Sequence, residues 1–96
     1  MNEPSATHYR IAPKARLIFD VARGKHMLIY PERGLELNEI GHAVLSMCDG
    51  QTSVTHMVER LAQRFGGANA DVIARDVTQF LAQLTQRGVV LEEQRE

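Results

Sequence analysis

The sequence has four histidines and one cysteine, which can bind metal ions or act as nucleophiles, but their spacing argues against both roles. No two of the histidines stand four residues apart, the spacing that places two metal ligands on one face of a helix. No thiol or carboxylate completes a ligand set around them. Cys48 is the only cysteine, which excludes an internal disulfide and a thiolate cluster. We therefore expect no metal site at His8, His26, His42, His56 and Cys48.

Motifs of other enzyme and cofactor classes are also missing from the sequence. No serine or histidine lies in a recognisable nucleophile turn, and the acidic residues are scattered rather than paired. The glycines of Arg23-Gly24 and Gly66-Gly67 fit turns, because neither has the strand-glycine-helix pattern that binds phosphate. These features favour a binding protein that is not an enzyme and needs no cofactor.

Length and charge narrow the choice of partner. The chain has 96 residues, enough for one small domain, and 44% of them are apolar. No apolar run approaches the roughly 18 residues of a membrane span, so we expect a cytoplasmic protein without a membrane partner. The net charge of −1 divides into +2 for residues 1–37 and −3 for residues 38–96. Neither part has the strongly basic face that binds nucleic acid, so no nucleic-acid partner is expected.

The first half of the sequence predicts three strands that pair in chain order. Residues 16–20 and 26–30 are apolar runs with an aromatic residue each, and Gly24 lies in the turn between them. Pro31 and Gly34 mark a second turn, at which we expect glycine to take an unusual backbone conformation. The alternating residues 35–37 then predict a short third strand.

The second half predicts three amphipathic helices. Asn38 is a good N-cap, and apolar residues follow it at helical spacing up to Asp49-Gly50. Cys48 lies on the inward stripe of this helix, where a thiol is inert. Ser53 caps a second helix, which ends at Gly66-Gly67. The third begins at Asn69 or Asp71 and ends at Arg87-Gly88, after which residues 89–91 could return as an extended segment.

This order predicts an α+β, winged-helix-like fold in which an N-terminal three-stranded antiparallel β-meander is followed by a three-helix bundle. The domain should span residues 14–91, with a flexible tail at 1–13 and a frayed C-terminus at 92–96. Winged-helix proteins insert a helix into the major groove of DNA, which is the strongest rival function. The third helix carries two charges of each sign, Asp71, Arg75, Asp76 and Arg87, and such a neutral surface gains little from phosphate contacts.

The third strand is the remaining candidate for function. An open strand edge at residues 35–37 presents unpaired N–H and C=O groups that can bind a second extended chain. The same edge could instead be covered by the N-terminal tail or by residues 89–91, or could pair two copies into a homodimer.

Several residues together resemble the PqqD family, whose name stands for pyrroloquinoline quinone biosynthesis protein D. The resemblance covers about residues 14–91, with His56 and the loop at residues 66–69 as local departures. Its most specific motifs are Tyr30-Pro31-Glu32, Leu37-Asn38 and Cys48-Asp49-Gly50, supported by Arg23-Gly24, Phe80-Leu81 and Arg87-Gly88-Val89-Val90.

The resemblance implies a peptide chaperone without catalytic activity. Such a protein binds the precursor peptide PqqA and presents it to PqqE, a radical S-adenosylmethionine enzyme that links a Glu to a Tyr within the peptide. Related recognition domains hold the peptide as an added strand beside the third strand and the third helix. We therefore expect the peptide-binding residues to be Leu35, Glu36 and Leu37 on the strand, facing Val72, Asp76, Gln79, Phe80 and Gln83 on the helix.

Overall fold

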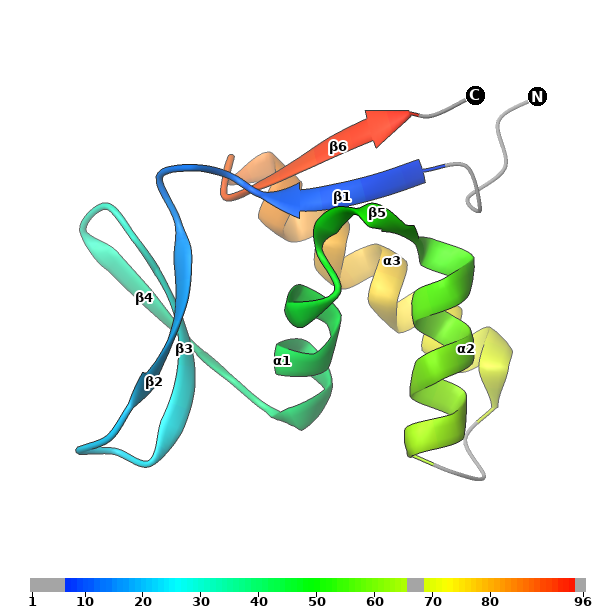
Figure 1. The fold of residues 1–96 in the computed structure, drawn as a ribbon, viewed down its shortest axis with the longest axis horizontal. Coiled ribbons are helices and arrows are strands. Elements are labelled where there is room, and N and C mark those ends of the chain that lie inside the picture. Colours follow the sequence, from blue (N-terminus) through cyan, green and yellow to red (C-terminus); the bar gives the residue numbers. More distant parts are fainter. Residues whose placement is uncertain (1–6, 66–68, 95–96) are drawn as a thin grey trace.

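The computed structural model describes residues 7–65 and 69–94, and within them six strands form two separate three-stranded sheets beside three helices (Figure 1). The first sheet has the order β2-β3-β4, and both of its strand pairs are antiparallel. Its strands are Arg16–Asp20 (β2), Lys25–Tyr30 (β3) and Arg33–Leu37 (β4). These are the three strands expected from the sequence, joined in chain order.

The two turns of this sheet use different residues. Gly24 has a φ of +68° in the β2–β3 turn, as its position suggested. In the β3–β4 turn the residue with positive φ is Glu32, at +64°, and not Gly34. Gly34 lies in β4, where an added Cβ would stand 3.3 Å from side-chain atoms of both Ile29 and Met27. A larger residue there would have to push these two side chains away.

The second sheet has the order β5-β1-β6 and was not expected from the sequence. Its strands are Thr7–Ile11 (β1), Asp49–Ser53 (β5) and Val90–Gln94 (β6), and β1 pairs antiparallel with both others. The expectation of a flexible tail over residues 1–13 is therefore wrong for residues 7–11, since Thr7 and Tyr9 are buried in the central strand. The expected frayed end is likewise wrong for residues 92–94, which lie in β6. Ala12, also part of the predicted tail, is buried and donates a hydrogen bond to the Val89 carbonyl. Residues 1–6 and 95–96 of these predictions lie outside the described residues.

The three helices begin at the N-caps that the sequence indicated. They are Glu39–Ser46 (α1), Val54–Arg64 (α2) and Ala70–Gln86 (α3). Asn38 accepts a hydrogen bond from the Gly41 N–H, Ser53 from His56, and Asn69 from Asp71. None of these helices in the described part of the chain is long and apolar enough to cross a membrane.

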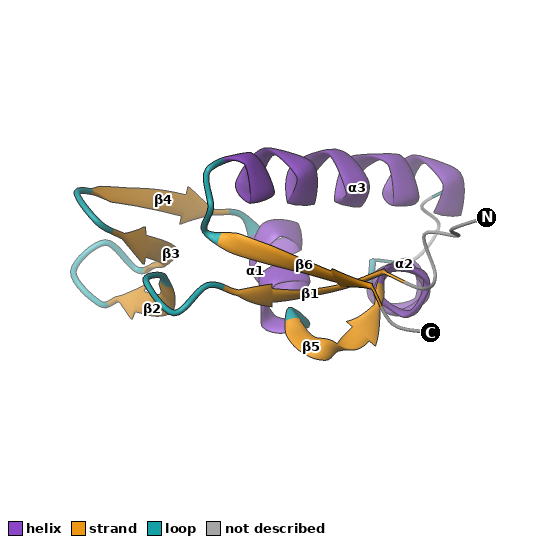
Figure 2. Cartoon of the chain, turned by 90° about the horizontal axis from the view of Figure 1, so that it is seen from above, coloured by secondary structure: helices purple, strands orange, loops and turns teal. Residues whose placement is uncertain are grey.

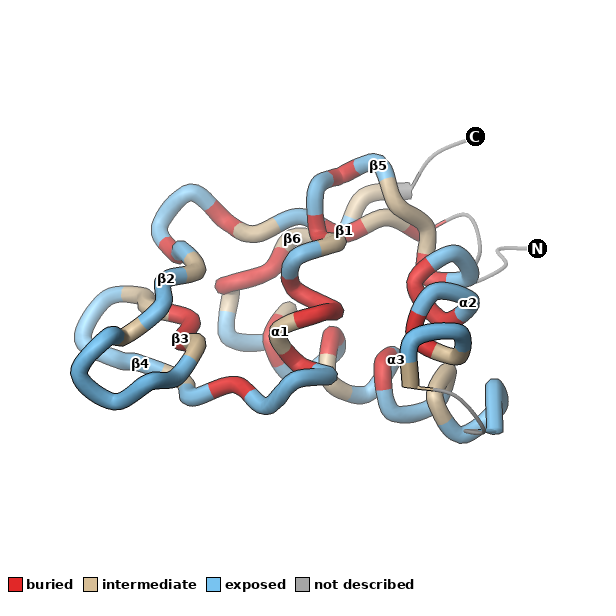
Figure 3. The backbone as a smooth tube through the Cα atoms, turned by 60° about the horizontal axis from the view of Figure 1, so that its bottom comes forward, coloured by how far each residue is buried: buried red, intermediate tan, exposed pale blue. Residues whose placement is uncertain are grey.

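The fold class is α+β, as expected, but the expected layout of a meander followed by a bundle is not confirmed, and neither is the winged-helix likeness. The six strands form two sheets, and strands and helices alternate along the second half of the chain. β5 lies between α1 and α2, and β6 follows α3. The β2-β3-β4 sheet lies at the opposite end of the molecule from α2 (Figures 1 and 2). One apolar core joins the helices to both sheets (Figure 3). Its most deeply buried side chains are Leu28, Leu45, Met57, Leu61, Leu81, Val44, Val77, Val89 and Val90.

Candidate functional site

The outer edge of β4 has no strand partner within the described residues. β4 pairs with β3 alone, and both are part of a sheet that ends at β4. The segment around residues 89–91, which could have covered this edge, instead enters β6 and pairs with β1. Residues 7–11 of the expected tail are held between β5 and β6. No described strand thus pairs with this edge, and an edge of this kind can bind another extended chain.

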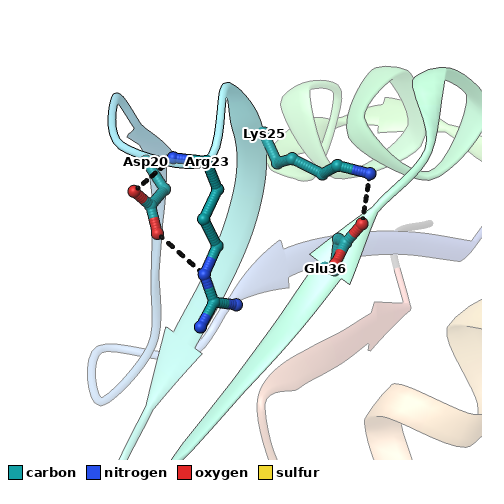
Figure 4. A network of polar contacts seen from close by, with 4 residues as sticks. All are labelled: Asp20, Arg23, Lys25 and Glu36. Atoms are coloured by element: carbon teal, nitrogen blue, oxygen red, sulfur yellow. Dashed lines mark hydrogen bonds and ion pairs between the residues drawn. The ribbon is translucent and has the colours of Figure 1, made fainter.

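The side chains of β4 alternate between two environments, as those of a strand must. Leu37 is buried and Leu35 half-buried, and both pack against the core. Glu36 is exposed, and its Oε2 lies 2.7 Å from Nζ of Lys25 on β3 (Figure 4). Both partners of this ion pair are about half exposed (51% and 50%), so it adds little stability, and it leaves the strand's hydrogen-bonding edge uncovered.

An apolar hollow of about 270 Å³ lies where β4 runs into α1. The α3 residues Asp76 and Phe80, both predicted to bind the guest, are among its walls. Val72, Gln79 and Gln83, the other predicted helix residues, are exposed on α3. Ten residues from the three helices, the α1 N-cap and the α2 C-cap line the hollow: Asn38, Ile40, Gly41, Val44, Leu61, Phe65, Ile73, Asp76, Val77 and Phe80.

Gly41 allows α1 and α3 to approach each other beside this hollow. A Cβ at position 41 would stand 3.5 Å from Cζ of Phe80 and 3.7 Å from Cδ2 of Leu37. Side chains from β4 and from α3 therefore both lie close to the α1 backbone at Gly41.

A second hollow lies at the other end of β4 and was missed by the sequence reasoning. It is lined by Tyr30 at the end of β3, Arg33 at the start of β4 and Arg87 after α3. Arg87 Nη1 donates a hydrogen bond of 3.3 Å to the Tyr30 hydroxyl. One signal was present in the sequence, because Arg87 continues the helical spacing of Phe80 and Gln83 along α3.

Cys48 and His42, two of the five side chains with metal-binding or nucleophilic chemistry, have shifted pKa values. Burial raises the pKa of the Cys48 thiol to about 12, with a smaller contribution from the charge of Asp49, so this buried cysteine is not an activated nucleophile. His42 on α1 stacks on His26 of β3 with ring centroids 3.6 Å apart. Burial lowers the pKa of His42, and the charges of His26 and Arg64 lower it further. Among the described residues no three His, Cys, Asp or Glu side chains group as metal ligands.

Comparisons with known proteins show the family to which the chain belongs. A sequence model of the family described as coenzyme PQQ synthesis protein D (PqqD) matches residues 25–90, which is more than half of the chain. The chain belongs to the PqqD family. A PqqA binding protein of Methylococcus capsulatus is 31% identical over 86 residues, covering 90% of this chain and 89% of that protein. A bifunctional coenzyme PQQ synthesis protein C/D of Methylorubrum extorquens is 36% identical over 84% of this chain, which corresponds to 22% of the longer protein.

Two solved PqqD structures resemble the fold. One is the solution NMR structure of the PqqD truncation of Methylobacterium extorquens PqqCD, described as a functional and stand-alone recognition element for ribosomally synthesized and post-translationally modified peptides. Its TM-score is 0.76 at 34% identity, with 93% of each chain covered. The other is the crystal structure of PqqD from Xanthomonas campestris, with a TM-score of 0.55 at 33% identity over 82% of this chain and 87% of that chain.

Proposed function

We propose that this PqqD-family protein binds the precursor peptide PqqA as an added strand on the outer edge of β4, in the space between β4 and α3. The open β4 edge that leads into an apolar hollow is the observation that carries this proposal. Within Leu35, Glu36 and Leu37, the backbone groups that point away from β3 supply the hydrogen bonds, because neighbouring residues of a strand bond to opposite sides. Asp76 and Phe80 face the guest from α3. Val72, Gln79 and Gln83 extend that wall along the helix.

The expected binding free energy requires both the strand edge and the apolar hollow. Four or five backbone hydrogen bonds contribute about 1 kcal/mol each, whereas a micromolar to nanomolar complex needs about −8 to −12 kcal/mol. Burying one apolar side chain of the guest in the hollow beside Phe80 adds about 1.5–3 kcal/mol. The strand edge therefore fixes the course of the peptide, and the hollow contributes much of the affinity and the choice of sequence.

The guest strand should run antiparallel to β4. Both existing pairs of this sheet are antiparallel, and antiparallel pairs are the commoner kind. The N-terminal part of the bound segment then lies at the apolar hollow, near Asn38. Its C-terminal part lies at the start of β4, near Arg33.

Binding rather than catalysis is the role that these residues support. The one cysteine is buried, and the names of the relatives refer to PqqA binding and to peptide recognition. We infer that the protein holds PqqA in the cytoplasm and presents it to the radical S-adenosylmethionine enzyme PqqE. The fused C/D relative supports association with biosynthetic enzymes, because there a PqqD segment is part of a longer synthesis protein.

Two partners other than PqqA could occupy the same site. A second copy of the chain could pair through β4 and form a homodimer, which light scattering over a range of protein concentrations would detect. Duplex DNA is the rival partner, although the two acidic and two basic residues of α3 and its C-cap do not favour it.

The experiment is an NMR titration of the isotope-labelled protein with synthetic PqqA and, separately, with duplex DNA. We expect shifts clustered on residues 33–38 and α3 with the peptide, and none with DNA. Glu36→Pro, which removes a β4 backbone donor, should weaken PqqA binding more than Glu36→Ala, which removes only the ion pair with Lys25. Peptide shifts that spare β4 and α3 would contradict the proposal.

A further inference from the structure

The second hollow, lined by Tyr30, Arg33 and Arg87, concentrates positive charge at the start of β4. Lys14 adds to it from a neighbouring loop, because its Nζ would be 3.2 Å from a Cβ at Gly88, the residue after Arg87. The two arginines of this hollow thus come from β4 and from the segment after α3, and Lys14 lies beside Gly88 on a third segment. An anion is the kind of ligand that such a site suits.

Neither arginine is neutralised by a carboxylate within the described residues. The ion pairs found there are Arg10 with Glu93, Arg23 with Asp20, and Lys25 with Glu36, and none of them involves Arg33 or Arg87. The recorded partner of Arg87 is the Tyr30 hydroxyl, which accepts one of its five N–H groups. Its remaining donors are available to a ligand. The closest acidic residue in sequence, Glu32, lines an adjoining hollow together with Lys14 and Arg16.

The two hollows mark opposite ends of the proposed guest strand. Along α3, Asp76 and Arg87 are separated by roughly 16 Å, at about 1.5 Å per residue of helix. Along β4, the positions of Asn38 and Arg33 are likewise about 16 Å apart, at about 3.3 Å per residue of strand. Figure 2 shows β4 and the C-terminal end of α3 on the same side of the molecule. An extended guest would cover this distance with about four or five residues.

We propose that the hollow of Tyr30, Arg33 and Arg87 binds a carboxylate of the guest peptide, about four or five residues after the apolar residue that fills the hollow beside Phe80. This inference rests on the proposed strand addition and deepens it. The strand edge accepts many sequences in several registers, whereas an apolar anchor and a carboxylate at fixed separation select one register. Arg33 and Arg87 are the specificity-determining residues of this end, and the Tyr30 hydroxyl positions the Arg87 guanidinium.

The carboxylate can come from an Asp or Glu side chain or from the C-terminus of the guest. Two sets of synthetic PqqA peptides distinguish these sources. In one set each Asp or Glu is replaced singly by Asn or Gln, and in the other the C-terminal carboxylate is amidated. We expect one change alone to weaken binding, by about three- to tenfold, because a charge-assisted hydrogen bond is replaced by a neutral one.

The protein variants test the same contact from the other side. Arg33→Gln and Arg87→Gln should each weaken PqqA binding about three- to tenfold in calorimetry at low salt, and the difference should shrink at high salt. Arg75→Gln is the matched control, since it removes the same charge from an exposed position of α3 that does not line the hollow. With the peptide that lacks the critical carboxylate, Arg87→Gln should have no further effect.

A charge exchange separates direct contact from general attraction. Arg87→Glu should weaken binding of PqqA more than Arg87→Gln does, and a peptide with Lys in place of the critical acid should recover affinity for Arg87→Glu but not for the wild type. If both Gln variants bind PqqA as tightly as Arg75→Gln does, the carboxylate hollow is refuted while strand addition stands. If the wild-type protein does not bind PqqA, both proposals are refuted.

Discussion

Replacing Gly41 by larger residues should close the apolar hollow without unfolding the protein. Gly41 is buried in the first turn of α1 and lines this hollow. A Cβ at this position would meet Asn38 Oδ1 at 3.2 Å and Phe80 Cζ at 3.5 Å. Only the first distance is tight, and the asparagine side chain has to move by a few tenths of an ångström. Alanine therefore fits at little cost.

The substitutions at Gly41 should have a small effect on the unfolding free energy and a large effect on peptide binding. Gly41→Ala gains up to about 1 kcal/mol of helix propensity, offset in part by the contact with Asn38, so its unfolding free energy should stay within about 1 kcal/mol of the wild type. Gly41→Leu places three further carbon atoms in the hollow and excludes the apolar anchor of the guest. Loss of that anchor costs about 1.5–3 kcal/mol of binding, which is roughly a 10- to 150-fold increase in Kd.

Isothermal titration calorimetry with synthetic PqqA measures the binding effect, and thermal unfolding followed by circular dichroism shows whether each variant folds. Gly41→Ala is the control, because it changes the same position without filling the hollow. A folded Gly41→Leu protein that binds PqqA within about twofold of the alanine variant would refute the role assigned to the hollow.

Two further predictions follow from pKa shifts. The pKa of His42 in the folded protein lies below its ordinary value of 6.5, because burial and then the charges of His26 and Arg64 disfavour its protonated form. The unfolded chain therefore binds this proton more tightly, so the stability linked to His42 is fully present above about pH 6.5 and is lost as the pH falls through the folded pKa. Urea unfolding at about pH 7.5 and 5.5 should show a smaller loss of stability for His42→Gln than for the wild type, and an equal loss would contradict this prediction. The Cys48 thiol, with a pKa of about 12, should resist Ellman's reagent at about pH 8 in the folded protein and react once urea unfolds it; rapid labelling of the folded protein would show that the thiol is accessible.

The sequence predicted those parts of the fold whose signals are local. The caps at Asn38, Ser53 and Asn69 each bond an N–H two or three residues away, so the residues that define each helix start are neighbours in sequence. The β2-β3-β4 strands are joined by short turns and pair in chain order. In both cases the residues that form the hydrogen bonds are close together in the sequence.

The second sheet lacked such signals. β1 at Thr7–Ile11 pairs with strands that begin at Asp49 and Val90, so nothing close in sequence identified it as a strand. The sequence of β5, Asp49–Ser53, is polar and resembles a turn, and it is extended because it pairs with β1. Sequence position alone placed residues 7–11 in a tail, and long-range pairing made them the central strand.

The candidate site likewise has parts that could be predicted from local sequence and parts that could not. The open β4 edge and the α3 face that includes Asp76 and Phe80 could be predicted, because each is one element with its own periodicity. The hollow of Tyr30, Arg33 and Arg87 could not, since its hydrogen bond joins residues that are 57 positions apart in the sequence. The resemblance to PqqD pointed to Tyr30 and Arg87 as part of a pattern without indicating that they meet.

The most direct test of strand addition is a scan in which single backbone amides of PqqA are N-methylated. Each methyl group removes one peptide donor and leaves the side chains and the protein unchanged. Because alternate residues of an antiparallel strand direct their N–H groups to the same neighbour, affinity should fall at every second position over a segment of about four or five residues. Uniform tolerance of N-methylation, or sensitivity that recurs every three or four residues as in a bound helix, would contradict the account.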